Sequence, residues 1–229
     1  MKTLFFNDNY IKALSRSYTV PCEFWQKDDE VFYTKNLLPP FTKFMKDLLP
    51  KLKKVDSRVN DNLSEILVTC KTRQNYTLPA DTDTEIGAII GHKKAMKGQP
   101  FAGLLFGFTP KKIILAGGIF GLSGEKAALL QEYLEKRKEQ YSLLIENEDF
   151  AISFGEGGFC HIPNEFVCTP HPIKVYKNFV GCTGELPARF ITDDILPDII
   201  IAHYKGIKAM NRFLQRALRP IRQEVKISV

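Results

Sequence analysis

Apolar residues recur every three or four positions in four segments of the chain, a spacing typical of amphipathic helices. These segments are residues 6–18, 41–53, 123–145 and 198–218. In the second segment, Pro50 is expected to kink or end the helix because proline lacks a backbone N–H. The sequence therefore predicts four helices, each with one face that can be buried against other parts of the protein.

Short and nearly continuous apolar runs mark the middle of the chain and predict β-strands. They are residues 65–71, 85–91, 104–108 and 113–116. The four residues between the last two runs include a proline and two lysines, which favours a hairpin turn. Four strands in succession are most simply joined as an antiparallel sheet.

The region after the third predicted helix is harder to interpret. Residues 151–154 and 166–168 are short apolar runs that predict strands, and residues 173–176 are a weaker strand candidate. Residues 179–187 are rich in turn-forming residues and are expected to lack regular structure. Taken together, the elements predict an α+β fold with a central, mainly antiparallel sheet flanked by helices, in one domain over residues 1–229.

Glycines at positions 117, 118, 121 and 124 follow the predicted hairpin. A glycine-rich segment before a helix can cradle a phosphate on backbone N–H groups. The segment contains no complete dinucleotide-binding or P-loop pattern, so an irregular strand end is the favoured interpretation. No cofactor is expected.

Composition narrows the class of protein. With 229 residues, 44% of them hydrophobic, the chain can bury a substantial core, and it has no apolar run of membrane-spanning length. Acidic residues come too early near the N-terminus for a secretory signal. The five cysteines are odd in number and form no Cys-x-x-Cys motif, which favours reduced thiols. We therefore expect a cytoplasmic protein that does not enter a membrane.

The net charge of +6 is unevenly distributed along the chain. Residues 1–115 carry +6, residues 116–202 carry −6, and residues 203–229 carry +6. Basic side chains recur three or four positions apart in the last predicted helix, at Lys205, Lys208, Arg212, Arg216 and Arg219. Such a face can contact phosphates. It can equally remain solvated, or pair with the acidic middle of the chain inside the fold.

Cysteine and histidine allow two further kinds of site. Cys168 and His171 have the spacing of half a zinc site, but Cys160 and its neighbour His161 make a poor second pair. Buried cysteines and a loop histidine are favoured instead, and no metal site is predicted. A nucleophilic cysteine activated by His92, His161, His171 or His203 would depend on a spatial proximity that the sequence alone does not determine.

Several short motifs follow one another along the chain in a recognisable order. They are Phe24-Trp25, Tyr33, Pro39-Pro40, Ile66–Arg73, Ile86-Gly87-Ala88, Leu104–Gly118 and Leu196-Pro197. This order resembles that of the domain of unknown function (DUF) 2461 family over roughly residues 4–218. The resemblance implies an α+β fold and carries no particular reaction. The chain departs from the family at Lys71–Asp83, where only Arg73 of an Arg/Asp/Arg/Phe segment remains.

These observations predict a cytoplasmic binding or interaction protein for an anionic, phosphate-bearing ligand, with nucleic acid as one possible partner. The residues expected to bind it are Arg73, Lys208, Arg212, Arg216 and Arg219.

Two alternatives remain open. In the first, the protein is an enzyme that acts on a phosphate-bearing substrate, and His92, His161 or His171 lines a pocket beside Arg73. In the second, it is a partner-binding module with an exposed aromatic patch around Phe24-Trp25.

Overall fold

The architecture was analysed in a computed structural model of the chain, which describes residues 4–69, 72, 84–93, 100–122, 124–154, 174–176 and 179–218. The described strands form one antiparallel sheet in the order β1-β2-β3-β4-β6-β5. Their bounds are Leu67–Thr69 (β1), Ile86–Gly91 (β2), Phe101–Phe108 (β3), Lys112–Phe120 (β4), Lys174–Tyr176 (β5) and Phe179–Pro187 (β6). The predicted α+β class with an antiparallel sheet is confirmed.

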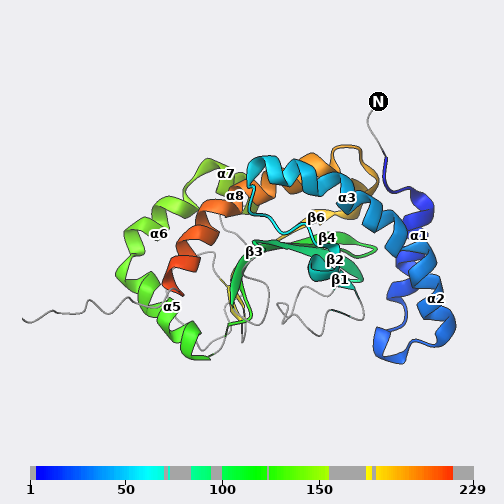
Figure 1. Ribbon diagram of the computed structural model, residues 1–229, viewed down its shortest axis with the longest axis horizontal. Helices are drawn as coiled ribbons and strands as arrows, with labels where there is room; N and C mark the ends of the chain where they lie inside the picture. The colour runs from blue at the N-terminus through cyan, green and yellow to red at the C-terminus, as the bar shows by residue number, and fades with distance from the viewer. Residues whose placement is uncertain are drawn as a thin grey trace, which may run out of the picture.

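The long helices α3 and α8 lie side by side across one face of the sheet, while α1 and α2 lie at one end of the molecule and α5 and α6 at the other (Figure 1). The helices are α1 (Asp8–Tyr18), α2 (Lys27–Asn36), α3 (Leu38–Val55), α4 (Leu63–Ile66), α5 (Gly124–Lys136), α6 (Lys138–Ile145), α7 (Glu148–Phe154) and α8 (Leu196–Ala217). Short 3-10 turns occupy Cys22–Phe24 and Ala188–Thr192.

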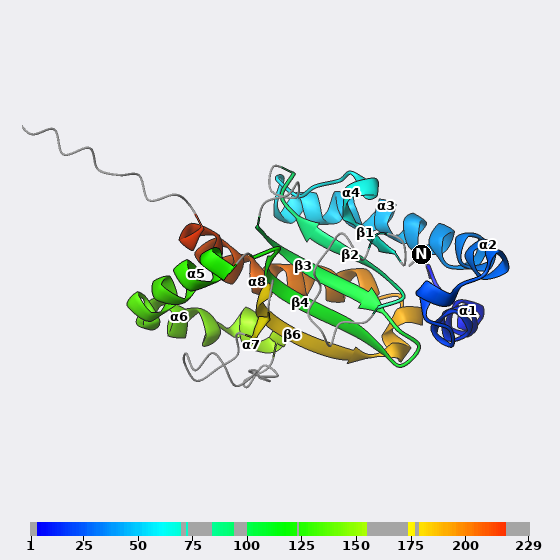
Figure 2. The same ribbon diagram turned by 90° about the horizontal axis from the view of Figure 1, so that it is seen from below.

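The main core lies between the sheet and these helices. Successive side chains of a strand point to opposite faces, so Leu104, Phe106 and Phe108 of β3 face the helices. Phe41 and Phe44 of α3 are fully buried against them, with the Phe41 and Phe108 rings 5.3 Å apart between centroids. On the other face of the sheet, seen from below in Figure 2, a smaller buried cluster includes residues of β2, β3 and β4.

Gly117 of β4 allows α8 to lie close to the sheet. A Cβ atom at this position would lie 2.3 Å from Cγ1 of Ile207, which is fully buried on α8. Real Cβ atoms do not come that close to another atom, so any larger residue would force Ile207 on α8 to shift. Gly117 and Gly118 therefore continue strand β4, and Gly117 lets α8 approach it, so the phosphate-cradle interpretation is wrong for Gly117.

Two sequence predictions about local structure are wrong, and a third is right only in part. Residues 151–154 belong to helix α7, where Phe150 and Phe154 are both buried one turn apart. A short apolar run does not distinguish a strand from a buried helix. Residues 179–187 form strand β6 despite their turn-forming composition, because β6 pairs along the whole length of β4. The strand predicted at 65–71 begins as helix α4 and becomes β1 only at Leu67.

Two helix predictions need smaller corrections. Helix α3 continues through Pro50 to Val55. Pro50 has no N–H, so the carbonyl of Lys46 loses its helical hydrogen bond. Both residues lie on the exposed side of the helix, where the helix can continue without that bond. The predicted helix at 123–145 is divided at Arg137 into α5 and α6. Helices α1 and α8 lie where the periodicity predicts them.

The expectation of reduced thiols fails at one position. Cys22 is disulfide-bonded, whereas the other described cysteine, Cys182, is buried and forms no disulfide. In addition, none of the described helices has the length and apolar character needed to cross a membrane.

Candidate functional site

A cavity of about 460 Å³ lies between the C-terminal half of α8 and the sheet. Helix α8 supplies half of its lining residues: Tyr204, Lys208, Asn211, Arg212, Gln215 and Arg216. The rest come from the end of α3 and the loop after it, the end of β2, and the start of β3: Asp56, Arg58, Ile90, His92, Ala102 and Gly103. Its volume is within the range of small-molecule sites.

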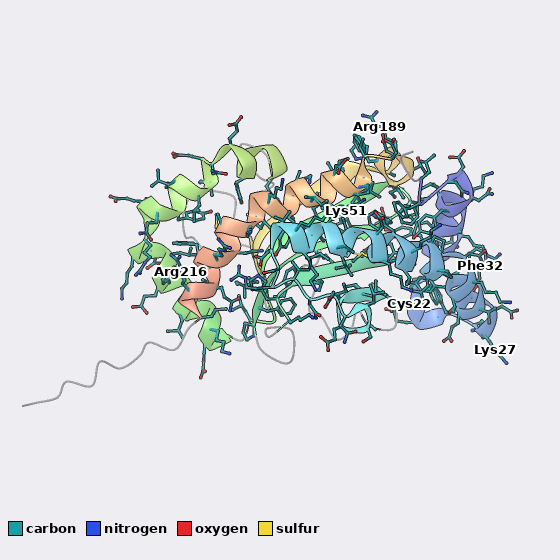
Figure 3. All side chains as sticks on the ribbon, turned by 45° about the horizontal axis from the view of Figure 1, so that its top comes forward. Cys22, Lys27, Phe32, Lys51, Arg189 and Arg216 are labelled. Carbon is teal, nitrogen blue, oxygen red and sulfur yellow. The ribbon has the colours of Figure 1, made fainter. Side chains whose placement is uncertain are left out.

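The spacing of residues on α8 explains why its polar side chains gather here. Residues three or four positions apart lie on one face of a helix, and the polar residues that line the cavity have this spacing. Ile207, Met210 and Leu214 fall between them and are buried in the core. One face of α8 therefore packs in the core, and the other lines the cavity. Arg216 lies near the C-terminal end of the helix (Figure 3).

Asp56 is the one acidic residue that lines the cavity among the described residues, and its side chain is only 4% exposed. Arg58 donates two side-chain hydrogen bonds to it, from Nε to Oδ1 at 2.9 Å and from Nη2 to Oδ2 at 2.8 Å. The backbone N–H of Arg58 donates a third, to Oδ1. Chiefly through the Arg58 side-chain bonds, the pKa of Asp56 is held well below its usual value, so Asp56 is ionised.

Lys208 joins α8 to the end of α3. Its Nζ donates to the backbone oxygen of Val55 at 2.7 Å and lies 3.8 Å from Oδ2 of Asp56. A cation at this place satisfies a terminal helix carbonyl and complements the negative end of the helix dipole. Lys208 is therefore already bound within the protein, although it lines the cavity.

His92 follows β2 and is held by a backbone bridge to Val59. Its Nε2 lies 3.4 Å from Oδ2 of Asp56, and its side chain is 37% exposed. Burial, followed by the positive charge of Arg58, lowers the pKa of His92, and these effects exceed the opposing effect of Asp56. His92 is consequently neutral at pH 7. Burial and then the charge of Asp56 likewise raise the pKa of Tyr204 above its ordinary value.

Two carboxamides fix α8 to the backbone of β3. Gln215 accepts a hydrogen bond from the backbone N–H of Ala102 through Oε1, at 2.8 Å. Asn211 donates through Nδ2 to the backbone oxygen of Gly103, at 3.0 Å. Asn211 is only 8% exposed, and its Oδ1 is buried and has no hydrogen-bond partner in the described part of the chain. A buried acceptor without a partner is uncommon in folded proteins.

Arg212 and Arg216 are exposed and line the cavity. Within the described part of the chain, neither forms an ion pair with an acidic residue. The lining thus contains four cationic side chains and one carboxylate, a net charge of +3 with His92 neutral. The acidic middle of the chain does not neutralise these two arginines in the described residues.

The structure brings together three of the five predicted binding residues, Lys208, Arg212 and Arg216, and adds His92 from the enzyme alternative. The other two, Arg73 and Arg219, lie outside the described residues, as do His161, His171, Cys160 and Cys168. His203 is buried away from the cavity lining and contacts the backbone oxygen of Ile199. Among the described residues, no cluster of potential metal ligands is present.

The aromatic pair of the partner-binding alternative is divided in the structure. Phe24 is 70% exposed, whereas Trp25 is partly buried against the core and donates its indole N–H to the backbone oxygen of Val20.

Sequence reasoning missed Asp56, Arg58, Tyr204, Asn211 and Gln215. The last three repeat the spacing of Lys208 and Arg212, so an inspection of all polar residues on α8, rather than only the charged ones, would have found them. Asp56 and Arg58 lie in a polar loop and reach the cavity only through the packing of α3 beside α8, which leaves no local signal in the sequence.

Comparison with known protein families shows to which family the chain belongs. The model of the family described as "Conserved hypothetical protein (DUF2461)" matches residues 22–213. The chain belongs to this family. The match includes most of the cavity lining and ends before Gln215 and Arg216. No curated protein and no solved structure matches the chain.

Proposed function

We propose that this DUF2461 protein binds a small, phosphate-bearing ligand in the cavity beside α8. The observation that carries the proposal is the pair Arg212 and Arg216, which line a cavity of about 460 Å³ and lack an acidic partner among the described residues. Guanidinium groups bind phosphate oxygens through paired, charge-assisted hydrogen bonds. Two of them one helical turn apart can contact the same anionic group.

The charges around the arginines support an anionic ligand. Asp56 would repel a phosphate if its charge were uncompensated, but Arg58 and Lys208 lie against it. With His92 neutral, the remaining charge in the lining is positive. The walls also include α8 and the start of β3. Side chains of α8 form hydrogen bonds with the backbone of Gly103 and Ala102, so these two walls of the cavity are fixed to each other.

The test is calorimetric titration with inorganic phosphate over a series of salt concentrations. We expect Arg212→Glu/Arg216→Glu to weaken binding about tenfold or more, because two charge-assisted contacts are lost and two repulsive charges are introduced. The matched control is Lys46→Glu/Lys205→Glu, which reverses two exposed lysines on α3 and α8 that do not line the cavity. It should change the affinity about twofold or less.

The same variants separate a cavity ligand from nucleic acid. Retention on heparin and on labelled RNA and DNA, measured with increasing salt, reports phosphate contacts over a wide surface. If both double variants lose retention equally and neither changes phosphate titration, the basic residues act as a diffuse surface and the cavity proposal is wrong. Phosphate binding that falls only in the arginine variant is the expected result.

A second candidate function is an enzyme acting on a phosphate-bearing substrate. The observation that favours it is the neutral His92, which lies 3.4 Å from the carboxylate of Asp56 in the cavity that the arginines line. A neutral imidazole can accept a proton, and cations can stabilise charge that develops in a transition state. This reading requires turnover of a phosphate monoester that is lost in His92→Asn while phosphate binding remains measurable.

We also infer a cytoplasmic location, although disulfides are rare in that compartment and Cys22 is disulfide-bonded. Cell fractionation combined with thiol alkylation tests it. A protein recovered from the cytosol with Cys22 alkylated would support the location. Recovery outside the cytosol with Cys22 protected would contradict it.

A further inference from the structure

The wall of the cavity formed by α8 has two parallel rows of polar side chains with different chemistry. One row is charged and consists of Lys208, Arg212 and Arg216; the other is neutral and consists of Asn211 and Gln215. Members of each row are one helical turn apart, so the rows run side by side along the helix. The charged row can bind the anionic group of a ligand, but the proposed function assigns no role to the neutral row.

Both carboxamides in the neutral row have fixed orientations. The backbone oxygen of Gly103 can only accept, so the NH₂ group of Asn211 must face it. Oδ1 is then the group that lacks a partner among the residues that the structure describes. The backbone N–H of Ala102 can only donate, so Gln215 must use its oxygen there. Its NH₂ group donates no hydrogen bond among the described residues. The row therefore offers one acceptor and one donor about one helical turn apart.

From this arrangement we infer that the ligand is a phosphate ester with a hydroxylated organic part, of the sugar-phosphate class. The inference rests on the proposed function, since the phosphate is assigned to Arg212 and Arg216. A hydroxyl group both donates and accepts, so neighbouring hydroxyls match the unused oxygen of Asn211 and the unused NH₂ group of Gln215. An alkyl group would leave both unpaired.

Few apolar side chains line the cavity, so the lining gives little reason to assign a different organic part. Ile90 and Ala102 are its aliphatic residues. Of the two aromatic rings in the described lining, Tyr204 is only 4% exposed and His92 lies against Asp56. Sites for nucleobases commonly provide aromatic stacking surfaces. The oxygen Oδ1 of Asn211 is covered, so its pairing with a ligand requires the side chains that line the cavity to shift.

The experiment titrates the full-length protein with inorganic phosphate, n-propyl phosphate, ribose 5-phosphate and adenosine monophosphate. We expect ribose 5-phosphate to bind about tenfold more tightly than n-propyl phosphate, as hydrogen bonds to fixed polar groups give discrimination of this order. In Asn211→Leu the preference for ribose 5-phosphate over n-propyl phosphate should fall to about twofold.

The ligand series on the wild-type protein keeps the test valid if Asn211→Leu does not fold. Equal binding of n-propyl phosphate and ribose 5-phosphate would overturn the sugar-phosphate assignment and leave the proposed phosphate site intact. Adenosine monophosphate binding tenfold more tightly than ribose 5-phosphate would also overturn it, because the carboxamides would then recognise a base. Binding of none of the four compounds would reject both the assignment and the proposed function.

Discussion

Helices α3 and α8 have similar sequence patterns but different surroundings. Each has a buried apolar face and a basic face, and each lies across the sheet (Figure 1). On α3 the lysines are mostly exposed; Lys51 pairs with Asp47 one turn away, at 2.5 Å, and Lys53 pairs with Asp61. On α8 the arginines line a cavity and have no acidic partner in the described residues.

The difference between the two helices shows that a row of basic residues does not by itself indicate a binding site. On α3, solvent and nearby carboxylates balance the charge, as they do on most protein surfaces. On α8, the strands β2 and β3 and the end of α3 form the opposite wall, so the charges face a confined space. Neighbouring elements therefore decide whether a basic face is a surface or a candidate site.

The largest expected effect concerns the close contact between α8 and the sheet. Gly117→Ala should destabilise the protein by about 3 kcal/mol in urea unfolding, since the added Cβ would lie 2.3 Å from Cγ1 of Ile207. In a double-mutant cycle, Gly117→Ala should cost less when position 207 is already alanine, because Ile207→Ala removes the closest atoms. Equal costs of Gly117→Ala with either residue at position 207 would contradict the contact.

The sequence predicted the parts of the fold that depend on local periodicity. Helices α1 and α8 and strands β2, β3 and β4 lie where their patterns place them, because each pattern reports one buried face. It failed at β6, which is defined by its pairing with β4, and at α7, where two phenylalanines are buried one turn apart. Both depend on contacts between segments distant in sequence.

The candidate site was likewise predicted only where its residues form a local pattern in the sequence. Lys208, Arg212 and Arg216 were found because their helical spacing is visible in the sequence. Asp56 and Arg58 were not, since they enter the cavity only where the end of α3 meets α8. The role of Asn211 was also invisible, because an unpaired buried oxygen is a property of the packed structure.

The second prediction compares an acidic residue that lines the cavity with one on the exposed face of α3. Asp56→Asn should cost about 2 kcal/mol at pH 7, as hydrogen bonds from Arg58 to a buried carboxylate are weakened. The pKa of Asp56 is lower in the folded than in the unfolded state, so the unfolded state takes up the proton first as the pH falls. The stabilisation is therefore present above about pH 4 and is lost progressively below it.

Asp47→Asn on α3 is the matched control. Its carboxylate is 44% exposed and pairs with an equally exposed lysine, so the substitution should cost about 0.5 kcal/mol or less. Urea unfolding of both variants between pH 2 and pH 7 checks the comparison. Similar losses at the two positions would mean that Asp56 is no more strongly held than a surface acid. A loss in Asp56→Asn that does not change with pH would mean that the charge of the carboxylate is not its cause.

The smallest expected effect concerns the protonation of His92, which depends on the charged groups that line the cavity. Asp56 at the end of α3, Arg58 in the following loop, and Tyr204, Lys208 and Arg212 on α8 are the titratable or charged groups around it. Burial and the nearby cations keep the pKa of His92 below its usual value. An anion bound in the cavity would favour the protonated imidazole, so binding and protonation should promote each other.

Sulfate is a suitable probe because its charge is constant between pH 5 and pH 8. We expect sulfate affinity to rise about threefold as the pH falls from 7.5 to 5.5, and this dependence to disappear in His92→Gln. The Lys46→Glu/Lys205→Glu variant should retain the pH dependence, since neither lysine lines the cavity. A pH dependence that survives in His92→Gln would place the responsible group elsewhere, and the bound anion would then lie too far from His92 for the proposed site.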